Sequence, residues 1–101
     1  MPAQKRPVNE QLQAFQTALG ETIRAGRKGR FNQDDFADQV GVHRSHMGLI
    51  EQGKLDIRLS TLLAVAGALD LPLSEVIRQV EARLAQQDSA PTPPPPGRGE
   101  R

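Results

Sequence analysis

The stretch NQDDFADQVGVHRSHMGLIEQGK, residues 32–54, decides the fold. Its apolar residues recur at helical spacing on either side of a glycine, Gly41. The spacing predicts one helix over 33–40 and a second over 44–52 that stops at Gly53. The segment is therefore expected to form two short helices joined by a tight turn.

The start of the first helix carries three local signals. Asn32 is a good N-cap, and Asp34 and Asp35 place negative charge in the first turn, where the helix dipole favours it. Phe31 and Phe36 occupy the two positions of a hydrophobic staple. These signals predict a helix that begins at residue 33.

The second helix has a polar start. Its cap position is His43, and Arg44, Ser45 and His46 follow. The two helices are expected to cross at the small residue Ala37. Their core side would carry Val40, Val42, Met47 and Ile50. Two short helices with a glycine in the turn are the layout of a DNA-reading pair, and the start of the second helix enters the major groove. The alternative is a helical bundle in which this helix is only structural.

Three further helices are expected around the pair. The first covers about 10–28, with a stripe of Leu12, Phe15, Leu19 and Ile23. The others cover about 61–69, capped by Ser60, and about 75–86. The fold class is thus all-α, a compact five-helix bundle. Residues 1–8 are expected to be a flexible arm, 9–87 the domain, and the proline-rich 88–101 a disordered tail.

Composition limits the classes of function. The chain has 101 residues, no cysteine and a net charge of +1. No apolar run approaches the roughly 18 residues of a membrane span, so we expect a cytoplasmic protein without a membrane partner. His43 and His46 lie three apart without a third ligand beside them, and no catalytic motif is present. We therefore expect no metal, no cofactor and no enzymatic activity.

The run at 32–54 and the following LSTLLAVAGALDLPLSEVI, residues 59–77, resemble the phage repressor and Cro-type helix-turn-helix family. The likeness spans about 24–84 and is similar to standalone regulators such as restriction-modification controller proteins. It implies a compact five-helix fold and a transcription regulator, for example a repressor, that binds DNA. Its partner would be double-stranded DNA with an inverted-repeat operator.

The resemblance also implies roles for particular residues. Arg44, Ser45 and Leu49 would face base edges, with His46 beside them, and Gln33 would bind a phosphate and brace the second helix of the pair. Arg44 has the chemistry for a bidentate bond to guanine, whereas Leu49 has only an apolar contact to offer, to a thymine methyl. The alternatives are an ion pair for Arg44 and a protein contact for Leu49. The other residues expected to contact phosphates are Asn32, Arg30, His43, Lys54 and Arg58.

The apolar stripe of the last helix predicts that the protein forms a dimer. Val76 and Ile77 are expected to complete the core, while Val80 and Leu84 extend the apolar stripe beyond it. An exposed apolar stripe usually marks an interface, so these four residues predict a homodimer with half-sites roughly 34 Å apart. The alternative function is a protein-interaction module on the same fold, an adaptor or an antitoxin-like partner of another protein. The low net charge, Leu49 and the proline-rich tail favour that alternative.

Overall fold

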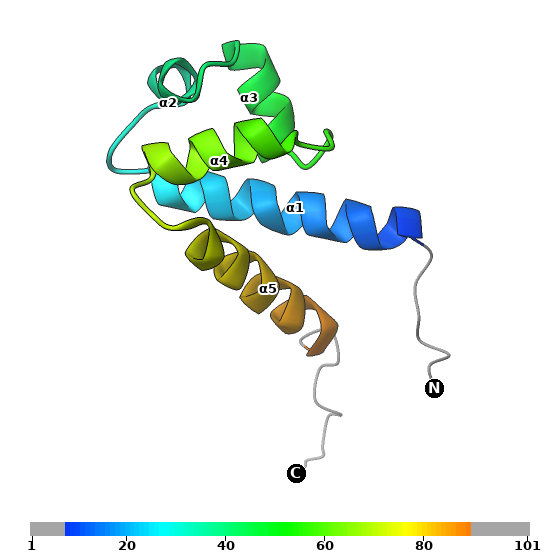
Figure 1. The fold of residues 1–101 in the computed structure, drawn as a ribbon. Coiled ribbons are helices and arrows are strands. Elements are labelled where there is room, and N and C mark those ends of the chain that lie inside the picture. Colours follow the sequence, from blue (N-terminus) through cyan, green and yellow to red (C-terminus); the bar gives the residue numbers. More distant parts are fainter. Residues whose placement is uncertain (1–7, 90–101) are drawn as a thin grey trace.

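The structure, a computed structural model, describes residues 8–89, and these form five helices and no strand (Figure 1). The helices are α1 (Val8–Arg27), α2 (Gln33–Val40), α3 (Arg44–Glu51), α4 (Leu59–Ala68) and α5 (Leu73–Ser89). The all-α, five-helix fold class is confirmed. Within the described residues no single helix is long and apolar enough for a membrane span, and α4 and α5 meet that test only as a pair bent by 99°.

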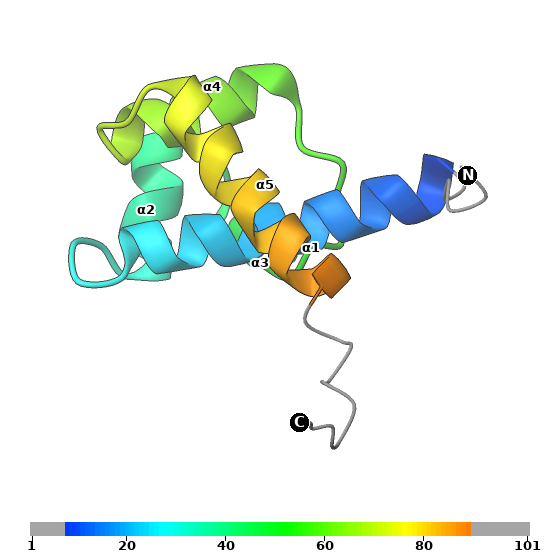
Figure 2. The same cartoon turned by 90° about the horizontal axis from the view of Figure 1, so that it is seen from below.

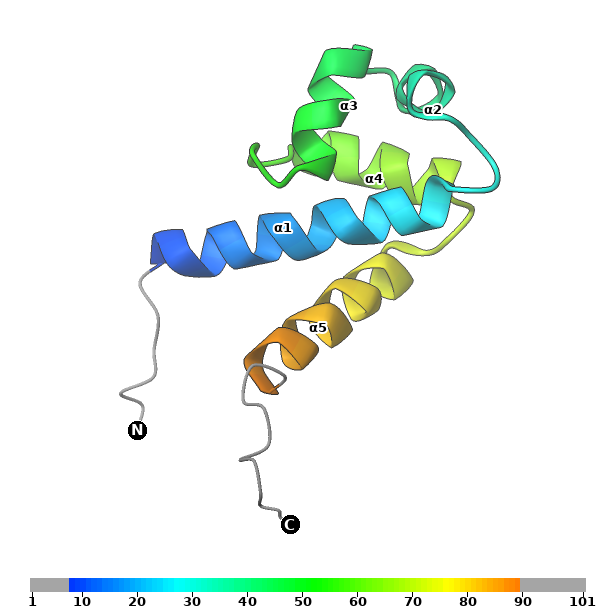
Figure 3. The same cartoon turned by 180° about the vertical axis from the view of Figure 1, so that it is seen from behind.

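Helix α1 lies at the centre of the fold. Helices α2, α3 and α4 lie on one side of it and α5 on the other, and the view from behind shows the same order (Figures 1 and 3). Figure 2 shows α5 crossing α1, with which it packs extensively. The buried core contains residues from every helix, with these fully covered large side chains: Ile23, Phe36, Met47, Val65, Val76 and Val80.

The local signals at the start of α2 are confirmed. The Asn32 side chain accepts a hydrogen bond from the Asp35 amide at 2.8 Å, which caps the helix. The rings of Phe31 and Phe36 lie 5.5 Å apart, as a hydrophobic staple requires. Gly41 ends the helix with φ of 93°, a left-handed conformation that favours glycine.

Several predicted boundaries are wrong by one to three residues. Helix α4 begins at Leu59, so Ser60 lies inside it and is not its cap; Arg58 takes the cap position without a side-chain cap bond. Val8 already belongs to α1, and α5 continues to Ser89. The remainder of the expected arm, 1–7, and of the expected tail, 90–101, lies outside the described residues.

The expectation that α5 leaves an uncovered apolar stripe is wrong. Val76 and Val80 are both 0% exposed, because α1 packs along this face of α5, and Ile77 and Leu84 are half-buried against the same core. Arg83 on α5 also donates a hydrogen bond to the buried Thr22 hydroxyl of α1 at 3.2 Å. The four residues expected at a dimer interface therefore belong largely to the protomer's own core.

Candidate nucleic-acid interface

Helix α3 presents one continuous outer face. It consists of the exposed or half-exposed residues Arg44, Ser45, His46, Gly48 and Leu49. Met47 and Ile50, on the opposite side, are 0% and 3% exposed and anchor the helix in the core. All four residues predicted to contact bases therefore share a single accessible surface.

The C-terminal end of α3 is held by a nearly buried ion pair. Glu51 accepts hydrogen bonds from Arg27 of α1, including one from Nη2 to Oε1 at 2.9 Å. The side chains of Arg27 and Glu51 are only 12% and 4% exposed. The hydrogen bond to Glu51 raises the pKa of Arg27, although burial acts in the opposite direction. The pair thus ties the end of α3 to the end of α1.

The Arg27–Glu51 pair was not predicted from the sequence. One signal was available: Glu51 falls on the core side of α3, one helical turn after Met47, where an acidic residue requires a partner. Nothing local identifies Arg27 as that partner, because the two residues are 24 positions apart. Their contact depends on how α1 and α3 cross.

Gln33 joins the same network from α2. Its amide donates to Glu51 Oε1 at 3.1 Å, and its amide atoms lie within 4 Å of the position that a Cβ on Gly48 would take. The first residue of α2 therefore touches the middle and the end of α3. This contact braces α3 against the rest of the pair.

Arg44 forms an exposed ion pair at the start of α3. Its Nη1 atom lies 3.4 Å from Asp34 Oδ2, and the two side chains are 69% and 60% exposed. An exposed pair of this kind contributes little stability, because water screens both charges. Arg44 can therefore leave Asp34 for another hydrogen-bond acceptor at low cost.

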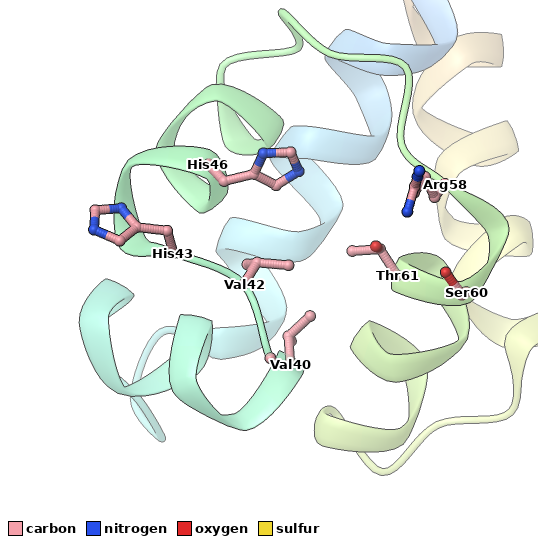
Figure 4. A pocket seen from close by; sticks show the side chains of 8 residues that line it. Val40, Val42, His43, His46, Arg58, Ser60 and Thr61 are labelled. Carbon is pink, nitrogen blue, oxygen red and sulfur yellow. The ribbon is translucent and has the colours of Figure 1, made fainter.

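A groove separates α3 from the start of α4 (Figure 4). Val42 and Thr61 point toward each other across it, with His46 on the α3 side and Arg58 on the α4 side. The full lining is Val40, Gly41, Val42, His43, His46, Arg58, Ser60 and Thr61. Within residues 8–89 no group of three or more His, Cys, Asp or Glu side chains is placed to hold a metal ion.

Two expected phosphate ligands also serve as helix caps. Asn32 uses its carbonyl oxygen for α2, and His43 Nδ1 accepts the Ser45 amide of α3 at 3.1 Å. The cap bonds leave the Asn32 amide nitrogen and His43 Nε2 available for other partners. Lys54 and Arg58 are exposed in the connection that follows α3.

Arg30 lies elsewhere. Its Nη1 donates to the Leu69 carbonyl at 2.9 Å, and its guanidinium sits 5.7 Å from the centre of the Phe31 ring. Leu69 is at the C-terminal end of α4, whereas the groove lies at the N-terminal end. The side chain is thus engaged away from the outer face of α3, and the phosphate contact expected of Arg30 stays a prediction.

Comparison with known proteins finds one matching family and similar proteins from a phage and a bacterium. The helix-turn-helix family profile matches residues 23–76. The immunity repressor protein of Bacillus phage phi105 is 38% identical over 73 residues, 71% of this chain and 49% of the repressor, so the chain spans about half the length of that relative. The control protein C.SmaI of Serratia marcescens is 30% identical over 60 residues, 58% of this chain and 71% of that protein.

Solved structures also share the fold. The restriction-modification controller protein C.AhdI of Aeromonas hydrophila superposes with a TM-score of 0.60 at 30% identity, over 62% of this chain and 97% of that chain. The clp gene regulator ClgR of Corynebacterium glutamicum superposes with a TM-score of 0.73 at 20% identity, over 76% and 83% of the two chains. The second likeness shows the fold alone.

Proposed function

The chain belongs to the helix-turn-helix family, and from this premise we propose that it regulates transcription by binding an inverted-repeat DNA operator as a dimer. The family comprises DNA-binding transcription regulators and not enzymes. The observation that carries the proposal is the outer face of α3, an accessible surface on a helix anchored from behind by Met47, Ile50 and Glu51. A helix held in this way has the rigidity that base reading in the major groove requires.

Each residue of the outer face has a role in the proposal. Arg44 leaves Asp34 and binds a guanine through O6 and N7. Ser45 and His46 hydrogen-bond to neighbouring base edges, and Leu49, 40% exposed, contacts a thymine methyl. Gly48 lies between these residues, and because it has no side chain it allows α3 to approach the major groove closely.

The phosphate contacts flank that face. Gln33, Asn32 and His43 lie at the starts of α2 and α3, and Lys54 and Arg58 lie in the connection after α3. Arg58 and His46 face the groove from opposite sides, which supports a path for one DNA strand along it (Figure 4). These contacts position the protein, whereas the outer face of α3 selects the sequence.

Selection from random double-stranded DNA by the purified full chain at physiological salt tests the proposal. We expect an enriched site with two inverted halves whose centres are about 34 Å, or one helical turn, apart. No enrichment from a folded, helical protein would overturn specific readout. It would favour the alternative, a protein-interaction module on the same fold.

Replacing Arg44 with alanine should weaken binding to the selected site by about 5- to 150-fold, the loss of one bidentate base contact. Specificity should relax at one base pair per half-site. Titration of labelled operators with each base at that position measures both effects. Arg78→Ala is the matched control. Arg78 pairs with Glu75 on α5, so this substitution removes the same charge at a site away from α3. Equal losses in the two variants would contradict base reading by Arg44.

Replacing Lys54 with alanine should weaken binding to all DNA sequences alike. A phosphate contact carries no sequence information, so the ratio of specific to non-specific affinity should stay constant. The slope of log affinity against log salt should become shallower by about 0.9, the value for one phosphate. Affinity measured at several salt concentrations checks this result. An unchanged slope would remove Lys54 from the phosphate contacts.

A further inference from the structure

Large apolar side chains are exposed at a few places among residues 9–87, whose side chains the structure describes. They are Leu12 on α1, Leu49 on α3, and Leu59 and Leu63 on α4. Leu49 belongs to the outer face of α3. Leu59 and Leu63 are the most exposed, at 66% and 51%, and they lie one turn apart on the same helix.

These two leucines define a surface of α4, the α4 stripe, which continues through Gly67 at the same four-residue spacing. Gly67 is exposed, and a Cβ built on it has no neighbour within 4 Å. At about 100° per residue, Leu63 lies on roughly the opposite side of α4 from Thr61, which faces the groove (Figure 4). The α4 stripe therefore points away from α3.

We propose that the α4 stripe, Leu59, Leu63 and Gly67, is the surface through which two copies of this chain associate about a two-fold axis. The proposal rests on the proposed function, in which a dimer reads two half-sites, and it replaces the expected interface on α5. The α5 residues are unsuited because the protomer has already buried Val76 and Val80.

The lack of charge on α4 supports a second copy of this chain as the partner that covers the α4 stripe. Across a two-fold axis each residue close to the axis meets its own counterpart, so any charge there meets a like charge. No residue from Leu59 to Ala68 is charged, and the stripe therefore meets itself without repulsion. The exposed side of α5 instead carries Arg78 and Glu81, which would face their own copies near such an axis.

The spacing of the elements also fits. Packed helices lie about 8–10 Å apart. In the dimer the helices would lie side by side in the order α3, α4, the partner's α4 and the partner's α3. The two α3 helices would then be about 24–30 Å apart if every neighbouring pair were in contact. The open groove widens the α3–α4 separation beyond direct packing. This widening moves the distance between the two α3 helices from about 24–30 Å toward the roughly 34–36 Å of one DNA turn.

The area available implies a weak dimer. A stable interface covers about 800 Å² and 20–30 residues on each partner, whereas α4 has ten residues, only some of which face outward. The association through the α4 stripe should therefore be reversible. Occupancy of a full operator should then rise more steeply with protein concentration than occupancy of a single half-site.

Sedimentation equilibrium of the full chain and of Leu63→Glu tests the surface directly. The substitution places a carboxylate near the axis in both copies, and we expect a dimer dissociation constant at least about 10-fold higher. Leu12→Glu is the matched control, an exposed leucine outside α4, and should leave the constant unchanged. Circular dichroism should show that both variants keep the wild-type helix content.

DNA binding separates this proposal from the proposed function. Leu63→Glu should keep wild-type affinity for a single half-site and lose at least about 10-fold on the full operator. If the wild type dimerises and Leu63→Glu alone disrupts the dimer, the α4 stripe stands even when no DNA is bound. If the wild type binds DNA but Leu63→Glu dimerises as well as Leu12→Glu, the α4 stripe is overturned while the proposed function stands. A wild type that stays monomeric in solution and on the full operator also overturns it.

Discussion

Replacing Glu51 with glutamine is expected to lower the free energy of unfolding by about 3 kcal/mol or more. The substitution keeps the size of the side chain but removes its charge. Arg27, only 12% exposed, would then hold a positive charge without a counter-ion. Uncompensated charge in such a site costs far more than the same change at the surface.

Urea denaturation followed by circular dichroism measures this loss. The matched control is Glu75→Gln, which breaks the pair with Arg78 on α5. Its side chains are 30% and 68% exposed, so water screens this pair better than the Arg27–Glu51 pair and the loss should be smaller. The double variant Arg27→Met with Glu51→Leu should recover much of the loss, since it removes both charges and fills the space with apolar atoms. A loss no larger for Glu51→Gln than for Glu75→Gln would show that the pair does not hold α3.

The position of Glu51 links this stability to function. Glu51 also accepts the Gln33 amide, so one carboxylate fixes α3 relative to both α1 and α2. Glu51→Gln should therefore weaken DNA binding even at temperatures where the variant remains folded. Arg44→Ala, by contrast, should weaken DNA binding and leave the unfolding free energy nearly unchanged, because the Arg44–Asp34 pair is exposed.

The second large effect is expected at Gly20, in the middle of α1. A Cβ at this position would lie 2.4 Å from the Glu51 carbonyl oxygen and 2.7 Å from that of Ile50. Both atoms belong to the backbone of α3, so they cannot rotate away as a flexible side chain would. Gly20→Ala should lower the unfolding free energy by about 1–3 kcal/mol, even though alanine is the better helix former.

Gly48→Ala is the matched control for Gly20→Ala. A Cβ at Gly48 would be at ordinary contact distance from the Gln33 amide, 3.7 Å or more. That variant should gain up to about 1 kcal/mol from helix propensity. Thermal melts of the two variants without DNA compare them directly. Similar melting temperatures would contradict a close approach of α1 to α3.

The local sequence determined the elements of this fold. Asn32, the Phe31–Phe36 staple and Gly41 act within a few residues of themselves, and the structure contains the cap, the staple and the left-handed turn that they predict. The outer face of α3 was also predictable, because helical spacing alone separates Arg44, Ser45 and Leu49 from the buried Met47 and Ile50. The start of α4 was predicted wrongly, because Ser60 is a good cap residue but lies inside the helix.

Only the tertiary structure decided which distant residues meet. Arg27 pairs with Glu51 across 24 positions, and Arg30 reaches the Leu69 carbonyl across 39. Gly20 is required for the close approach of α1 to α3, although in its own helix it is merely unfavourable. Val80 is buried because α1 crosses α5 there, whereas Leu63 stays exposed on the far side of α4. Helical periodicity determines which residues share a face, but the crossing of the helices determines which faces are covered.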